Sequence, residues 1–270
     1  MTHKALSVLL VGDAMRSEFA HVFEWLREHS ELAVVSDMAA AAERLAAADW
    51  DPELIVVAQS WPGEFSPKQI DRLRRMRPLA RLSELLGSWC EGETRTGRPA
   101  GGTLRNYWHQ WLPRMGPQFE RAARGQRPVW SLPTTATDDE RLLATVERGE
   151  LPQRTPASRG LIAVLLSSGV MARAVCDACP TRGYACIWLP HGREKYLAGV
   201  RAVIWDAPPV VESWAGSMAQ LRQAWKDTPI VALAGFPRIE DVERLRAAGA
   251  AAVVSKPFLL DDLFWQIEQL

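Results

Sequence analysis

Short, unbroken runs of apolar residues recur along this chain, and each is followed by a stretch with helical periodicity. Leu54–Ala58 and Leu161–Leu166 contain only apolar residues, which is typical of strands buried on both faces of a parallel sheet. After the first such run, at Leu6–Val11, apolar residues repeat at i, i+3, i+4 and i+7: Phe19, Val22, Phe23 and Leu26. Parallel strands need crossover connections, usually helices, so this alternation predicts α/β domains with doubly wound parallel sheets.

The alternation occurs twice, which predicts two domains at residues 1–150 and 160–270. Each half supplies five strands in the same order, so each is predicted to form a five-stranded parallel sheet. Residues 151–159 carry two prolines and no periodicity, and we expect them to form the linker.

The first half is longer than the second, and we assign the excess to an insertion at about 88–127. Within it, Leu104–Leu112 has helical spacing and ends at Pro113, which predicts a short helix there. Val129–Pro133 is then expected to be the fifth strand of the first sheet. The alignment of the two halves favours this assignment, because Ser131-Leu-Pro133 matches Ser255-Lys-Pro257 in the second half.

Composition limits the kinds of partner and the cellular location that are expected for this chain. The 270 residues have a formal net charge of zero, so no general basic surface for nucleic acid is expected. No apolar run reaches the length of about 18 residues that suggests a membrane helix, and no secretory signal precedes the first strand. Four cysteines without a secretory context predict reduced thiols and a cytoplasmic location.

Two motifs carry a resemblance to a known family. The second half ends in Val253-Val-Ser-Lys-Pro-Phe258, followed by Asp261-Asp-Leu263. In the first half, Asp51–Ala58 is followed by Trp61-Pro-Gly63. These segments resemble the last strand and the third-strand loop of response-regulator receiver domains. The resemblance implies two flavodoxin-like domains in tandem, each a receiver with altered phosphorylation residues.

Receivers hold Mg²⁺ with an acidic pair after the first strand, accept phosphate on an aspartate that ends the third, and place a lysine after the fifth. In the first half the resemblance puts Gly12 and Asp13 at the acidic pair, Ala58 at the acceptor and Leu132 at the lysine position. Alanine has no oxygen to receive a phosphoryl group. This half is therefore expected to have lost the chemistry.

The second half keeps more of the pattern. Asp206 falls at the acceptor position and Lys256 at the lysine position, while Ser167 and Ser168 replace the acidic pair and Ala234 replaces the Thr or Ser. Mg²⁺ favours carboxylate oxygens, so tight Mg²⁺ binding is not expected here. We interpret Asp206 and Lys256 as an ion pair kept for structural reasons, with phosphorylation of Asp206 as the alternative.

The segment 88–102 leaves the fourth strand at the end where open α/β sheets bind ligands. Its glycines, charges and tryptophan make it a candidate anion or peptide site, through Trp89, Glu91, Glu93, Arg95 and Arg98. The alternative is a surface loop packed on itself. The next helix offers Trp108 and Trp111 as anchors for a partner, although both are equally suited to a core.

Three cysteines and a histidine, namely Cys176, Cys179, Cys186 and His191, have spacing that could suggest zinc. However, the first two are expected on a regular helix and the third on a strand, where cysteine is usually a buried small residue. We therefore predict no metal site and no cofactor.

No further domain is left once the two receiver-like copies are assigned. The leading hypothesis is a non-enzymatic signalling or scaffold protein that acts through protein partners, of which a second copy of the chain is one form. Two alternatives remain: a regulator phosphorylated on Asp206, and a small-molecule binder or enzyme that uses the 88–102 loop. No phosphate-binding glycine pattern or nucleophile elbow supports the last.

Overall fold

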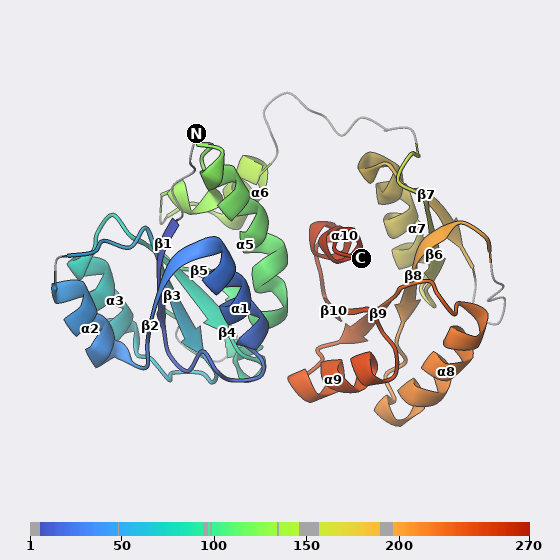
Figure 1. Cartoon of the computed structure of the whole chain (residues 1–270), viewed down its shortest axis with the longest axis horizontal. Coiled ribbons are helices and arrows are strands. Elements are labelled where there is room, and N and C mark those ends of the chain that lie inside the picture. The colour runs from blue at the N-terminus through green and yellow to red at the C-terminus, as the bar shows by residue number, and fades with distance from the viewer. Residues whose placement is uncertain are drawn as a thin grey trace. The chain divides into compact units, whose positions relative to one another are not determined.

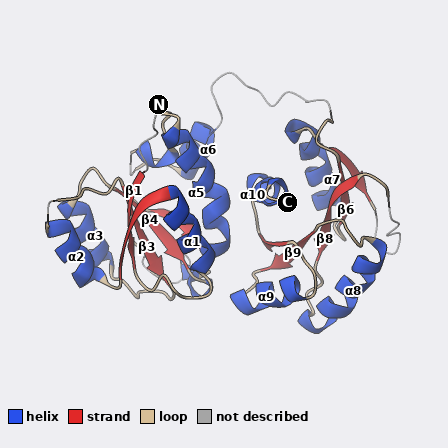
Figure 2. Ribbon diagram, in the orientation of Figure 1, coloured by secondary structure: helices blue, strands red, loops and turns tan. Residues whose placement is uncertain are grey.

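The computed structural model describes residues 6–47, 49–93, 97, 99–133, 135–145, 157–189 and 197–270. The chain divides into two compact units, Met1–Glu147 and Arg148–Leu270. Each unit alternates strands and helices (Figure 2).

The first unit contains a five-stranded parallel sheet in the order β2-β1-β3-β4-β5. Its elements are β1 (Leu6–Val11), α1 (Ala20–His29), β2 (Ser30–Val35), α2 (Met38–Ala46), β3 (Leu54–Gln59), α3 (Pro67–Met76), β4 (Arg81–Leu86), the 3₁₀ turn η1 (Ser88–Cys90), β5 (Leu104–Tyr107), α5 (Trp108–Ala123), the 3₁₀ turn η2 (Val129–Ser131) and α6 (Asp138–Thr145).

The second unit repeats this arrangement with the order β10-β9-β8-β6-β7. Its elements are β6 (Leu161–Leu165), α7 (Gly169–Ala178), the 3₁₀ turn η3 (Cys179–Arg182), β7 (Ala185–Trp188), β8 (Val200–Asp206), the 3₁₀ turn η4 (Val211–Ser213), α8 (Trp214–Ala224), β9 (Ile230–Gly235), α9 (Ile239–Ala247), β10 (Ala252–Lys256) and α10 (Leu260–Glu268).

Numbered within its own unit, each sheet has the strand order 2-1-3-4-5, which is the flavodoxin-like doubly wound order. The predicted fold class is confirmed. In each unit helices cover both faces of the sheet: α2 and α3 lie opposite α1 and α5, and α8 and α9 lie opposite α7 and α10 (Figure 1). The carboxyl ends of the parallel strands therefore meet at one edge of each sheet. We call it the carboxyl edge.

Local sequence explains where several helices begin. The Asp37 carboxylate accepts hydrogen bonds from the backbone N–H groups of Ala39 and Ala40 at the start of α2. These bonds lower the pKa of Asp37. At α3, Ser66 and Gln69 form a capping box, and Pro67 occupies the first turn, where its missing N–H costs nothing.

The prediction of the fifth strand in the first unit is wrong. Leu104–Tyr107 forms β5 and pairs with β4, whereas Val129–Ser131 is the 3₁₀ turn η2. Pro128 and Pro133 flank the expected strand, and neither has an N–H to donate to a sheet ladder. The segment interpreted as an insertion at 88–127 therefore contributes a strand of the sheet and a helix of the core.

The helix after β5 is also longer than predicted. It runs through Pro113 and Pro117 to Ala123, although each proline removes a backbone hydrogen bond. Trp111 and Phe119 on this helix pack edge-on against Trp25 of α1, with ring centroids 6.2 and 5.0 Å away. Burial of such large side chains stabilises by about 1.5–3 kcal/mol each, which offsets the cost of the prolines.

The linker expected at 151–159 lies outside the described residues up to residue 156. Every helix in the described part of the chain is too short or too polar to cross a bilayer.

Candidate functional site

The carboxyl edge of the second unit holds the acceptor-position aspartate. Asp206 ends β8, and its Oδ1 lies 2.5 Å from Lys256 Nζ at the end of β10. Ser167 Oγ, just after β6, donates to Asp206 Oδ2 at 2.6 Å. Both carboxylate oxygens are thus engaged, and the side chain is only 13% exposed.

The acidic pair of a receiver is absent at this edge. Ser167 bonds to Asp206, and Ser168 caps α7 by accepting a hydrogen bond from Met171 N at 3.3 Å. Ala234 is buried within β9. The structure brings Ser167, Asp206 and Lys256 together as the resemblance implied, and it places neutral hydroxyls where Mg²⁺ would need carboxylates.

Exposed apolar side chains occur in the segments that end or follow each strand of this sheet. We call them the apolar rim: Val170, Trp188, Val210, Phe236, Leu259 and Leu260. Since the strands are parallel, all six lie toward the carboxyl edge that contains Asp206. Clustered exposed apolar residues are a feature of interaction sites. The sequence analysis missed this rim, because its members are scattered over five loops.

Phe236 is the most unusual member of the rim. It follows β9 directly, its side chain is 66% exposed, and its backbone φ is +44°. A bulky non-glycine residue in the left-handed region costs about 1–2 kcal/mol. Its N–H donates to Lys256 O at 3.3 Å, which ties it to the end of β10. Strained backbone of this kind often accompanies function.

The first unit has a closed carboxyl edge at the corresponding place. A Cβ added to Gly12, after β1, would lie 2.5 Å from the carbonyl oxygen of Ala58 on β3. Beside them, the buried Glu18 carboxylate accepts a hydrogen bond from Ser88 N at 2.9 Å and so caps η1. Asp13 is exposed and bonds to the backbone of Met15. The acceptor position therefore carries no oxygen, and position 12 has no room for a side chain.

The prediction that Leu132 stands at the lysine position of this unit needs to be corrected. In the second unit, Asp206 pairs through Leu233 to Val254, two residues before Lys256. The same path in the first unit runs from Ala58 through Leu85 to Asn106, two residues before Trp108. Trp108 therefore occupies the lysine position. Leu132 does not, because it follows η2 rather than a strand.

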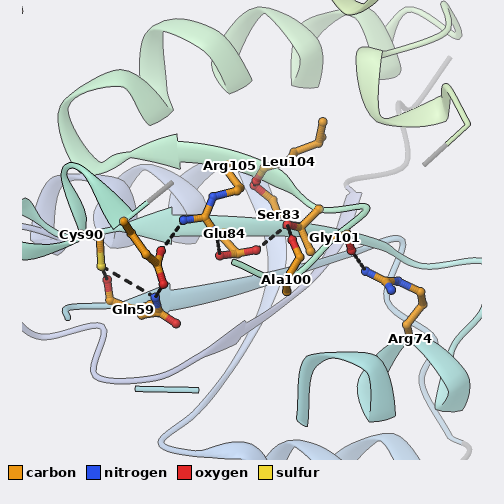
Figure 3. A network of polar contacts seen from close by, with 11 residues as sticks. Gln59, Arg74, Ser83, Glu84, Cys90, Ala100, Gly101, Leu104 and Arg105 are labelled. Atoms are coloured by element: carbon orange, nitrogen blue, oxygen red, sulfur yellow. Dashed lines mark hydrogen bonds and ion pairs between the residues drawn. The ribbon is translucent and has the colours of Figure 1, made fainter. Parts of the chain in front are cut away.

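A buried charged network lies beside this edge (Figure 3). Glu84 on β4 stands opposite Arg105 on β5, and Arg105 Nη1 contacts Glu84 Oε2 at 2.5 Å. The other guanidinium nitrogen, Nη2, bonds to Glu93. Thr103 donates its hydroxyl to Glu84, and Gln59 Nε2 lies 3.5 Å from Glu93. Two buried carboxylates thus share one guanidinium.

Burial sets the proton affinities in this network. It raises the pKa of Glu84, although the Thr103 and Arg105 contacts act in the opposite direction, and the nearby Glu93 charge adds to the rise. Burial also raises the pKa of Cys90 to about 12, so this thiol stays protonated.

The remaining candidates in the first unit divide into three groups. Trp89 is exposed, so the loop does not fold over this side chain. The carboxylates are engaged: Glu93 by Arg105, and Glu91 by His109 at 3.3 Å. Arg95 and Arg98 lie outside the described residues.

Trp108 and Trp111 are buried, so their interpretation as partner anchors is wrong and they belong to the core. The apolar residues whose spacing suggested a docking face lie on the side of α5 that packs on α1.

Comparison with known proteins finds distant structural matches. No family model matches the chain, and no curated protein sequence matches it. Among solved structures, the chemotaxis response regulator CheY4 of Vibrio cholerae is 22% identical, over 43% of this chain and 98% of that one, with a TM-score of 0.34. A protein named as a two-component system response regulator/GGDEF domain protein is 12% identical over 97% of both chains, with a TM-score of 0.35.

The strand order and the flanking helices give the fold independently of these matches. Both units have the flavodoxin-like doubly wound fold.

Proposed function

We propose that the chain is a non-enzymatic signalling or scaffold protein whose receiver-like units act through contacts with protein partners. The observation that carries the proposal is the apolar rim, with the strained and exposed Phe236 next to Lys256. Aromatic anchors in the centre of an interface supply most of the binding free energy in protein complexes.

The state of the two phosphorylation positions supports the same proposal. The first unit has Ala58 in place of an acceptor and a carboxyl edge closed by Gly12 and Glu18. In the second unit, Asp206 is neutralised by Lys256 and held by Ser167, with no acidic pair beside it. Such a unit needs no phosphoryl group to balance its charges. Its carboxyl edge is available as a constant binding surface.

Replacing Phe236 by glycine is expected to separate binding from stability. Glycine adopts positive φ without strain, so Phe236→Gly should leave the second unit as stable as before, or stabilise it by up to about 1 kcal/mol. Loss of the exposed ring should weaken partner capture at least about tenfold, or about 1.4 kcal/mol. Quantitative mass spectrometry of proteins retained by wild-type and variant baits measures the capture, and purified partners, including a second copy of this chain, then give the affinity.

The matched control is Leu79→Ala, which removes an exposed apolar side chain before β4, at the opposite end of the strands of the first unit. A partner consistent with the proposal depends on Phe236 and is indifferent to Leu79. If no retained protein, and no self-association, depends on Phe236, the rim is not the binding surface.

Phosphorylation of Asp206 is the second candidate function, favoured by the 2.5 Å Asp206–Lys256 contact. With Ser167 and Ser168 at the Mg²⁺ positions, we expect no stable phosphorylation by acetyl phosphate, with or without Mg²⁺. Phosphate-affinity electrophoresis checks this. A shifted band that depends on Mg²⁺ and disappears in Asp206→Asn would establish the second candidate instead.

A small-molecule site in the 88–102 loop is less well supported. Glu91 and Glu93 are already paired within the unit, and Cys90 is buried with its thiol near the Gln59 carbonyl oxygen at 3.5 Å. These groups hold the loop against the sheet, so we assign them a structural role.

A further inference from the structure

Helix α7 lies directly over the edge strand β7. At one end, Trp188 of β7 packs against Gly169, where an added Cβ would be 3.2 Å from the indole ring. At the other end, Tyr184 N donates to the carbonyl oxygen of Cys179 at 3.0 Å. Side chains alternate along a strand, so Cys186 lies on the same face as Tyr184 and Trp188, toward the helix.

Three thiols meet in this space. Cys176 and Cys179 are three residues apart at the end of α7, on the side that packs on the sheet. The Cys186 thiol interacts with both of them. Cys179 is fully buried, whereas Cys176 and Cys186 are half-buried, and all three are free thiols.

Cys179 and Cys186 form the more strongly coupled pair. The hydrogen bond from the Cys186 thiol lowers the pKa of Cys179, and the same interaction raises the pKa of Cys186. The Cys186 thiol therefore donates its hydrogen bond to the Cys179 sulfur. Burial, by contrast, raises the pKa of Cys176. Two thiols that pack together between a helix end and a strand, one of them half-buried, are suited to thiol–disulfide exchange.

We propose that Cys186 and Cys179 form a reversible dithiol site that small disulfides oxidise. The half-buried Cys186 thiol gives its proton to water as its sulfur attacks one sulfur of the small disulfide, a mixed disulfide forms, and the first small thiolate leaves and takes up a proton. The Cys179 thiolate then attacks the Cys186 sulfur and releases the second. The small disulfide is reduced to two thiols, and the protein loses two hydrogens in forming the Cys179–Cys186 bond.

The site fixes the end of α7 to the edge strand when it is oxidised. Among the described residues no group of three or more His, Cys, Asp or Glu side chains is arranged to hold a metal ion, so the inference concerns disulfide exchange and not metal binding. It is also independent of the proposed partner-binding function, because neither of the two reacting cysteines belongs to the apolar rim.

The test uses the full reduced chain and excess oxidised glutathione. Free thiols per denatured chain should fall from four to two, without dimers, and recover with dithiothreitol. Peptide mapping of the wild-type protein without reduction should find Cys179 joined to Cys186. This measurement needs no variant, so it holds even if a cysteine variant folds poorly.

Variants establish the order of the steps. Cys179→Ala should stop at glutathione bound to Cys186, and Cys186→Ser should form no internal disulfide. The control Cys90→Ser, which removes the buried thiol of the first unit, should oxidise like the wild type. A count that stays at four, a link that joins Cys176 to Cys186, or an internal disulfide that survives in Cys179→Ala would overturn the inference.

Discussion

Replacing Arg105 by methionine is expected to lower the free energy of unfolding of the first unit by about 3–5 kcal/mol. Arg105 bonds to both Glu84 and Glu93, which are 1% and 6% exposed. Methionine fills a similar volume but leaves two buried carboxylates without their shared cation. An uncompensated buried charge costs far more than the lost contact itself.

The loss of unfolding free energy in Arg105→Met should depend on pH in a definite direction. Burial raises the pKa of Glu84, so the folded unit binds this proton more readily than the unfolded chain, and stability falls as the pH rises above the ordinary pKa of glutamate. Loss of Arg105 raises the pKa further. The Arg105→Met variant should therefore lie closer to the wild type at mildly acidic pH than at neutral pH.

Hydrogen exchange of the full chain measures both effects, since peptides from the second unit serve as an internal standard. The control is Arg27→Met, which removes an exposed ion pair with Glu24 on α1 and should cost at most about 1 kcal/mol. Replacing Glu84, Glu93 and Arg105 together by methionine should recover most of the loss. If Arg105→Met costs no more than the control, the network does not stabilise the unit.

Trp111→Ala is expected to destabilise the first unit by about 3–5 kcal/mol. Trp111 is fully buried between Trp25 and Phe119, and its removal leaves a large cavity in the aromatic cluster that holds α5 on the sheet. The helix also contains Pro113 and Pro117, so it depends more than most on such packing. Urea unfolding, monitored by hydrogen exchange of peptides from the first unit, measures the loss of unfolding free energy.

Trp89→Ala is the matched control, because this indole is 61% exposed in η1. Its removal should change stability by no more than about 0.5 kcal/mol. Equal effects of the two substitutions would contradict the assignment of Trp111 to the core and of Trp89 to the surface.

The second unit was predictable from sequence because its strands are uniform. Ala202–Trp205 and Ile230–Ala234 are buried on both faces and read as unbroken apolar runs. The fifth strand of the first unit was not, because β5 is an edge strand containing Arg105 and Asn106. Its arginine is stabilised by Glu84 on the neighbouring strand, a contact that appears only once the two strands are paired.

The candidate site was predictable from sequence only in part. Asp206, Lys256 and Ser167 were found through the family resemblance, and the structure brings them into contact. Phe236 was missed, because a single phenylalanine in a loop gives no periodic signal and its positive φ depends on the fold around it. The opposite charges of Glu84 and Arg105, in two segments near one edge, were the available hint of the buried network.

The close approach of Gly12 to Ala58 limits which residues position 12 can accept. A carboxylate at position 12 would require a Cβ 2.5 Å from a backbone oxygen and a side chain tolerating a φ of +119°. A single substitution at position 12 therefore cannot place a second carboxylate beside Asp13 unless the backbone moves. In the second unit Ser167 and Ser168, which follow β6, already carry exposed side chains. Position 12 of the first unit is thus closed to side chains by the backbone of β3, whereas the turn after β6 in the second unit accepts them.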